Sequence, residues 1–157
     1  MAQLIIVGIS DQNVAFPPDT LITYALGSCV GICIFDPVAR YAGMSHILLP
    51  SSSLTTNDKN IYKFADTAIK ALVSIMETRG CRRTRMTAKI AGGANMFLSS
   101  GQSIGDRNVH AVKEELGKLR IRIVAEDCGG NYGRTIQLDP QDGSVMVKTS
   151  CKGSQVM

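Results

Sequence analysis

One cysteine of this chain stands at a bend between two apolar segments and could act as a nucleophile. Residues 21–26 are largely apolar or β-branched, Gly27-Ser28-Cys29 interrupts them, and a second apolar run begins at Val30. A glycine at such a bend lets the backbone turn tightly and leaves the neighbouring thiol and N–H groups open to a ligand. A thiol in this setting attacks a carbonyl carbon once a base has removed its proton.

A candidate base lies in the next apolar run. His46 is one of two histidines in the chain. It could take the proton from Cys29, giving a thiolate–imidazolium pair in which the pKa of the thiol is lowered, and later protonate a leaving group. Thr23 could orient the imidazole by accepting a hydrogen bond from its second ring nitrogen. Purely structural roles stay open for all three residues, since free cysteines and core histidines are often inert and threonine favours strands.

Backbone groups around the bend could stabilise an oxyanion. We expect Gly27 and Ser28 to support this role beside the N–H group of Cys29. The Ser28 hydroxyl is an alternative nucleophile, but the adjacent thiol is intrinsically more nucleophilic. Two glycine-rich turns further along the chain match neither common nucleotide-binding pattern. We expect their residues to line the site or to form its turns: Gly92, Gly93, Asn95, Gly129 and Gly130.

The remaining cysteines suggest neither a disulfide framework nor a metal site. The chain has five cysteines, an odd number, and the four besides Cys29 are scattered without a C-x-x-C pair: Cys33, Cys81, Cys128 and Cys151. Such spacing is typical of reduced thiols in a reducing compartment. We therefore expect no metal and no cofactor.

The bend and His46 must be positioned by a small sheet. Residues 30–35 and 42–49 predict two strands joined by a turn, and this hairpin would bring His46 back towards Cys29. Apolar residues on both faces of 30–35 predict a central strand that is covered on both sides. The other predicted strands are 3–9, 21–26, 84–91, 121–128, 134–138 and 144–148. Helices are predicted from about 58 to 79 and from about 106 to 118 by apolar residues at helical spacing. This order favours an α+β fold with a layered mixed sheet and two main helices.

Composition favours one soluble cytoplasmic domain. The chain has 157 residues, 45% of them hydrophobic, which is enough for a single domain over 1–157 with a frayed tail at about 150–157. We expect no signal peptide and no membrane insertion, because no apolar run is long enough. The net charge of +4 suits an acidic protein partner, and 5% aromatic residues without tryptophan argue against nucleic-acid binding.

Five blocks of sequence, in order along nearly the whole chain, resemble the CheD family of chemoreceptor glutamine deamidases. The blocks are Leu26-Gly27-Ser28-Cys29-Val30, Gly43-Met44-Ser45-His46 with Leu49-Pro50, 88–96, Ile104-Gly105-Asp106-Arg107-Asn108, and 129–134. Five matching blocks are far more specific than any one of them.

The resemblance implies a cysteine-dependent protein-glutamine glutaminase. It would convert glutamine side chains of methyl-accepting chemotaxis receptors to glutamate and release ammonia through a thioester. By motif, Cys29 is the nucleophile, His46 the base and acid, and Thr23 the orienting residue. The resemblance further implies the fold of the cytotoxic necrotizing factor deamidases and binding of a CheC-type phosphatase of the response regulator. Two alternatives stay open: a non-catalytic adaptor for such a phosphatase, and another thiol acyl-transfer hydrolase.

Overall fold

The computed structural model describes residues 1–96 and 103–157, which form two five-stranded mixed sheets and two main helices. Sheet A has the order β1 (Leu4–Ile6), β3 (Thr20–Leu26), β8 (Arg134–Leu138), β9 (Val145–Thr149), β10 (Gly153–Val156). Sheet B has the order β2 (Asp11–Ala15), β5 (Tyr41–Ile47), β4 (Val30–Asp36), β6 (Thr87–Gly92), β7 (Arg122–Cys128). The helices are α1 (Ala65–Thr78) and α2 (Ile104–Lys118), with 3₁₀ turns η1 (Ser52–Leu54) and η2 (Arg83–Arg85). The predicted α+β fold is confirmed.

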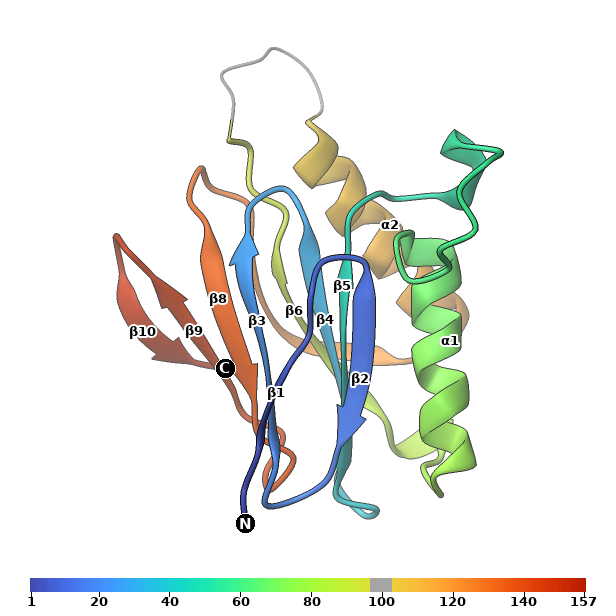
Figure 1. The fold of residues 1–157 in the computed structure, drawn as a ribbon, viewed down its shortest axis with the longest axis vertical. Coiled ribbons are helices and arrows are strands. Elements are labelled where there is room, and N and C mark those ends of the chain that lie inside the picture. The colour runs from blue at the N-terminus through green and yellow to red at the C-terminus, as the bar shows by residue number, and fades with distance from the viewer. Residues whose placement is uncertain (97–102) are drawn as a thin grey trace.

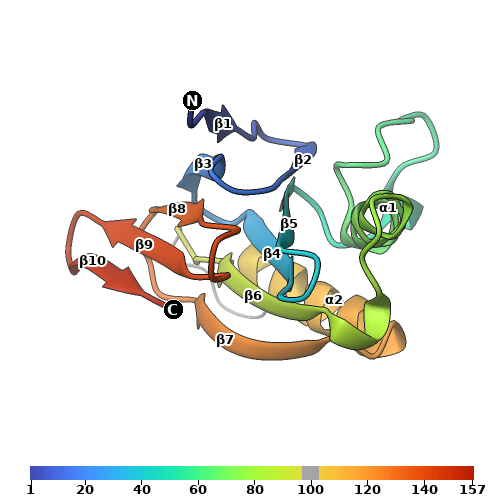
Figure 2. The same ribbon diagram turned by 90° about the horizontal axis from the view of Figure 1, so that it is seen from below.

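The molecule has three layers (Figures 1 and 2). Both helices cover one face of sheet B, and sheet A packs on the other face. Between sheet B and the helices, β4 contributes Val30, Ile32 and Ile34 to one apolar cluster. Between the two sheets, Cys33 of β4 joins a second cluster. The prediction that this central strand is covered on both sides is confirmed. Cys29 directly precedes this strand, and His46 lies on its neighbour β5.

Two strands were missed because their sequences are short and polar. β2 was expected to be a polar break, but it pairs antiparallel with β5 from Asp11 opposite His46 to Ala15 opposite Ala42, at the edge of sheet B. The predicted frayed tail at 150–157 is wrong for 153–156, which pair with β9 as strand β10. Edge strands carry exposed polar side chains and so lack the apolar alternation that marks a strand.

Both helices begin at residues other than those predicted. α1 begins at Ala65 rather than near Asp58, because the carbonyl of Lys63 accepts hydrogen bonds from the N–H groups of Leu48 and Leu49 and holds this segment extended. In α2 the hydroxyl of Ser103 caps the helix by accepting a bond from the N–H of Asp106 at 3.1 Å, so Asp106 lies inside the first turn. The composition of residues 99–103 predicts a Gly/Ser loop, and these residues lie outside the described part of the chain except for Ser103.

Candidate functional site

A bulge in β3 prepares the bend that carries Cys29. Thr23 pairs with Ile136 and Leu26 with Arg134, so two residues of β3 face one residue of β8 between them. Ala25, the second of the two, has a left-handed backbone with φ of 60°. The extra residue changes the alternation of the strand, so that both Thr23 and Leu26 point into the interior. Without it, one of them would face solvent.

Two carbonyl groups of the bend accept hydrogen bonds from backbone N–H groups. The carbonyl of Gly27 accepts a bond from Ala94 N–H at 2.9 Å, and that of Cys29 accepts one from Gly93 N–H at 2.8 Å. The N–H of Gly27 is committed to the carbonyl of Ala25 at 3.0 Å, so Gly27 supports the backbone and does not supply an oxyanion donor. Within the described chain, the N–H of Ser28 has no protein acceptor. It is therefore available to a ligand.

The β4–β5 hairpin places His46 on the same face of sheet B as Cys29. Gly31 pairs with His46 and Val30 with Ile47. Since alternate residues of a strand share a face, Cys29, two positions before Gly31, lies on the side of His46. This side faces sheet A, and a Cβ added at Gly31 would come within 2.6 Å of Ile136 Cδ1 across the interface. The predicted hairpin is confirmed, and its register places Cys29 and His46 on the same face of sheet B, near the same end of the hairpin.

Thr23 fixes the imidazole of His46 from the opposite sheet. Thr23 Oγ1 lies 2.7 Å from His46 Nδ1 and donates to the carbonyl of Val7, also at 2.7 Å. A hydroxyl has a single proton, and a carbonyl oxygen only accepts, so that proton belongs to the bond with Val7. The hydroxyl must then accept from Nδ1, which therefore carries the ring proton. The other nitrogen, Nε2, keeps its lone pair free.

Nε2 of His46 is a buried base with no protein hydrogen-bond partner within the described residues. Burial lowers the pKa of His46 to about 4. Burial also raises the pKa of Cys29, and the smaller effect of the residue's own backbone N–H works in the opposite direction. These directions favour a neutral thiol and a neutral imidazole at rest. The expected lowering of the Cys29 pKa by His46 is therefore wrong for this resting state.

The glycine-rich turns form the backing of the bend. Gly92 has φ of 113°, and a Cβ there would overlap the carbonyl oxygen of Cys29. Gly129 N–H donates to the carbonyl of Gly92 at 2.9 Å, and Asn95 N–H donates to that of Gly130 at 2.8 Å. Gly92 and Gly93 thus contact the backbone of Cys29 directly. Gly129 and Gly130 bond other residues of these turns.

Two buried polar residues of the site region were missed. Asn108 on α2 is fully buried and donates from Nδ2 to the carbonyls of Ser28 at 2.9 Å and Leu48 at 3.0 Å. Its position four residues before Val112 continues the predicted apolar stripe, so a polar residue there was the available signal. Arg134, 2% exposed, binds Asp127 at 3.0 Å and the carbonyl of Gly129 at 2.9 Å. It supports the second glycine-rich turn.

Other regions of the described chain offer less chemistry. A hollow of about 450 Å³ lies between β2 and α1, lined by residues such as Val14, Tyr62 and Ile75, and it includes neither Cys29 nor His46. The five cysteines are all free. Among residues 1–96 and 103–157, no group of three or more His, Cys, Asp or Glu side chains could hold a metal ion. Neither helix within those ranges has the length and apolar character needed to cross a bilayer.

Comparison with known proteins gives one consistent family. Residues 48–149 match the family model described as CheD chemotactic sensory transduction. A protein of Syntrophomonas wolfei named probable chemoreceptor glutamine deamidase CheD is 48% identical, and the alignment covers 100% of both chains. A protein of the same name from Lachnoclostridium phytofermentans is 47% identical over 95% of both chains. The chemoreceptor glutamine deamidase CheD of Bacillus licheniformis is 45% identical over 96% of this chain and 92% of its own.

The family match extends beyond a single motif. The aligned relatives span the bend at Cys29, the strand of His46 and the glycine-rich turns, because the alignment with the Syntrophomonas protein covers the entire chain. The five sequence blocks that carried the resemblance are thus part of a similarity over the full length. On this evidence the chain belongs to the CheD family.

Proposed function

We propose that this protein is a chemoreceptor glutamine deamidase in which Cys29, His46 and Thr23 carry out thiol catalysis. The relatives' names support the activity, and one observation of the site supports the mechanism. That observation is the free lone pair of His46 Nε2, set by the bond from Nδ1 to Thr23, on the face that Cys29 shares. A buried base without a partner is rare in a structural cluster, because leaving a polar atom unpaired costs about 1–3 kcal/mol.

The first half-reaction transfers the acyl group to the thiol. Nε2 of His46 takes the proton of Cys29 as Sγ attacks the carbonyl carbon of the substrate carboxamide. The N–H groups of Ser28 and Cys29 hold the oxyanion of the tetrahedral intermediate. His46 then gives its Nε2 proton to the leaving nitrogen, the C–N bond breaks, and ammonia departs. A thioester between substrate and Cys29 remains.

The second half-reaction hydrolyses the thioester. Nε2 takes a proton from water while the water oxygen attacks the thioester carbonyl. The C–S bond breaks, and Sγ recovers the proton from His46. The product is a side-chain carboxylic acid, which is a glutamate when the substrate is glutamine. Thr23 keeps its bond to Nδ1 throughout and stabilises the imidazolium that forms between the proton transfers.

Burial of the site supports a side chain as the substrate. Cys29 is 7% exposed and His46 is fully buried. A peptide bond carries bulk on both sides and cannot approach such a thiol without a wide cleft. A glutamine carboxamide stands at the end of a narrow, flexible stem, which suits a buried nucleophile. The net charge of +4 also suits an acidic receptor surface.

The test is incubation with the cytoplasmic fragment of a chemoreceptor, with amide-to-acid conversion measured by mass spectrometry. We expect the wild type to convert specific glutamines and Cys29→Ala to convert none. Cys33→Ala is the matched control, because Cys33 is a buried cysteine on β4 and belongs to the same cluster between the sheets as Cys29. Equal conversion by Cys29→Ala and wild type would overturn the assigned nucleophile.

Other outcomes of the same incubation separate the alternatives. Incorporation of a labelled amine at glutamine would indicate a transglutaminase-like transfer, and backbone cleavage would indicate a peptidase. Receptor binding without any conversion would favour the adaptor. Binding of a CheC-type phosphatase stays a prediction from the family resemblance, and titration calorimetry with such a phosphatase tests it.

A further inference from the structure

Asn108 joins the two segments that carry the reactive groups. Its Nδ2 donates to the carbonyl of Ser28, the residue before Cys29, and to the carbonyl of Leu48, two residues after His46. Asn108 itself lies on α2, which packs on the outer face of sheet B. One side chain from the helical layer therefore holds the nucleophile's bend and the end of the base's strand at the same time.

The amide acts where the pairing of the two strands ends. The last pair of the β4–β5 ladder joins Val30 to Ile47. Beyond it the chains continue into the bend on one side and into the loop after β5 on the other. Ser28 and Leu48 lie in these two continuations, so their carbonyls need a donor from elsewhere. The two N–H bonds of the Asn108 carboxamide supply it and extend the connection past the end of the sheet.

The side chain of Asn108 also has an unpaired buried oxygen, which is unfavourable for stability and points to a function. Oδ1 of Asn108 is buried and has no hydrogen-bond partner within the described residues. A leucine at this position would remove that unpaired oxygen and fill similar volume. A carboxamide, however, is the small side chain that offers two N–H donors from one nitrogen. The side chain leaves one buried oxygen unpaired but supplies two N–H donors. This pattern is expected where the position of the bonded backbone matters more than the stability of the fold.

Asn108 supplies the one side-chain hydrogen bond among those that the three carbonyl groups of the bend accept from described residues. The carbonyls of Gly27 and Cys29 are held by the N–H groups of Ala94 and Gly93. Only the carbonyl between them, that of Ser28, is held by a side chain. A substitution at Asn108 can therefore loosen the bend while leaving the two backbone bonds in place.

We propose that Asn108 is a positioning residue, which fixes Cys29 relative to His46 by bonding the backbone on both sides. The proposal rests on the proposed function, because it assumes that Cys29 and His46 act together. Displacement of a reacting group by about 1 Å costs on the order of 10²-fold in rate. We therefore expect Asn108→Leu to lower kcat for deamidation by about 10- to 100-fold and to leave KM unchanged.

A double-mutant cycle gives a readout that a merely structural role would not move. The rate of Cys29 alkylation by iodoacetamide is measured at the Cys29 peptide in the wild type, His46→Ala, Asn108→Leu and the double variant. In the wild type we expect His46→Ala to slow alkylation by about tenfold or more. In the Asn108→Leu background the same change should have less than about a threefold effect, because the imidazole no longer reaches the thiol.

Matched variants keep this test decisive. Asn108→Ala removes both N–H donors without adding bulk or a buried charge, so it replaces Asn108→Leu if that variant does not fold. Glu115→Gln changes another buried polar residue of α2, one that binds Lys118 instead of the bend. We expect it to keep the full effect of His46→Ala.

The outcomes distinguish the two proposals. If the wild type shows the His46 effect and the Asn108 variants retain it in full, with unchanged kcat, the positioning role is overturned and the catalytic pair stands. If the wild type shows no His46 effect, the catalytic pair fails, and the positioning role fails with it. If coupling is present without glutamine conversion, the positioning role stands and the deamidase assignment is wrong.

Discussion

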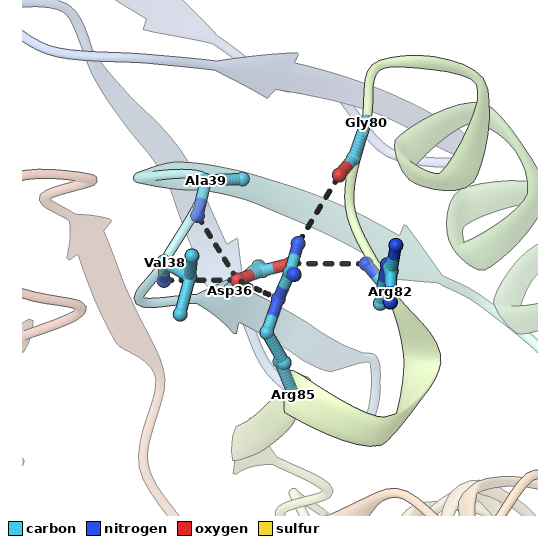
Figure 3. Close-up of polar contacts among 6 residues, drawn as sticks. All are labelled: Asp36, Val38, Ala39, Gly80, Arg82 and Arg85. Carbon is cyan, nitrogen blue, oxygen red and sulfur yellow. Dashed lines mark hydrogen bonds and ion pairs between the residues drawn. The ribbon is translucent and has the colours of Figure 1, made fainter.

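The two ends of the β4–β5 hairpin each bury polar groups, but only one end pairs all of them with hydrogen-bond partners. At the far end from Cys29, Asp36 is fully buried and every carboxylate oxygen is bonded (Figure 3). Arg85 donates from Nη2 at 2.9 Å, and the N–H groups of Val38, Ala39 and Arg82 donate at 3.0 to 3.1 Å. At the other end, Nε2 of His46 has no protein partner within the described chain.

The direction of each pKa follows from this difference. Burial by itself would raise the pKa of Asp36, but the bonds from Arg85 and from the backbone outweigh it, and the pKa is lowered. At His46 burial acts without such compensation and lowers the pKa to about 4. Asp36, with both oxygens hydrogen-bonded, stays charged and stabilises the fold. His46 keeps Nε2 without a protein partner within the described chain, so this atom can bind a proton, which is the property a general base needs.

The largest expected effect is the loss of activity on replacing His46. His46→Gln removes the base, and we expect kcat to fall by about 10²- to 10⁴-fold with a small change in the free energy of unfolding. Deamidation assays and urea titrations measure the two quantities. His110→Gln is the control, because the side chain of His110 is 76% exposed. An active His46→Gln variant would contradict the assigned base.

Replacing Asp36 should lower the stability of the fold and leave the catalytic activity unchanged. Asp36→Asn leaves Arg85 without its carboxylate, and we expect the free energy of unfolding to fall by roughly 2–3 kcal/mol. The estimate is at the low side because the Arg85 side chain stays 27% exposed. Activity per folded molecule should not change. Asp58→Asn, which breaks the more exposed pair with Lys63, should lower the free energy of unfolding less than Asp36→Asn does.

The pH dependence of stability should separate the two ends. Between pH 6.5 and 4 the unfolded chain protonates His46, whereas the native state, with a pKa of about 4, does not. The unfolded state then binds more protons, so stability falls with falling pH, by about 2–3 kcal/mol at pH 4.5. Asp36, with its lowered pKa, contributes stability above pH 3.8 that is lost only as the pH falls below that value.

Urea titrations of wild type and His46→Gln at pH 7 and pH 4.5 test this separation. The variant should lack the loss of stability that the wild type shows between these pH values. The same loss in both proteins would show that another group causes it. Asp36→Asn should retain the loss, because its own titration lies at lower pH.

The smallest expected effect concerns the orientation of the base. Thr23→Val removes the hydroxyl between Val7 and His46, so the imidazole loses its fixed tautomer, and we expect kcat to fall by about 10- to 100-fold. Thr23→Ser keeps the hydroxyl and should retain most of the activity. A wild-type rate in Thr23→Val would show that the bond to Nδ1 does not matter for catalysis.

Most of the fold was predictable where a pattern repeats. The stripe of Ile69, Leu72 and Met76 indicated α1, and apolar runs indicated β3, β4 and β5. β2 and β10 were missed because edge strands need no buried face along their whole length. The early start predicted for α1 failed because tertiary pairing of Lys63 with the residues after β5 overrides local helix preference.

The site was predictable in its residue types and less so in its geometry. Cys29 and His46 could be singled out because each interrupts an apolar run, and the hairpin implied that they meet. The direction of the Cys29 pKa could not be inferred, since it depends on how much water the packed sheets exclude. The role of Asn108 could not be inferred, because its two acceptors, the carbonyls of Ser28 and Leu48, lie 80 and 60 positions away along the chain.

The bond between Thr23 and His46 also runs from one sheet to the other. His46 lies on β5 of sheet B and Cys29 directly precedes β4, while Thr23 lies on β3 of sheet A and Val7 directly follows β1. A molecule in which sheet A has opened locally would keep the β4–β5 hairpin, yet the His46 ring would turn freely and exchange its proton between both nitrogens. In the proposed mechanism, His46 is therefore correctly oriented as a base only when the two sheets pack on each other, and a partly folded molecule should be inactive.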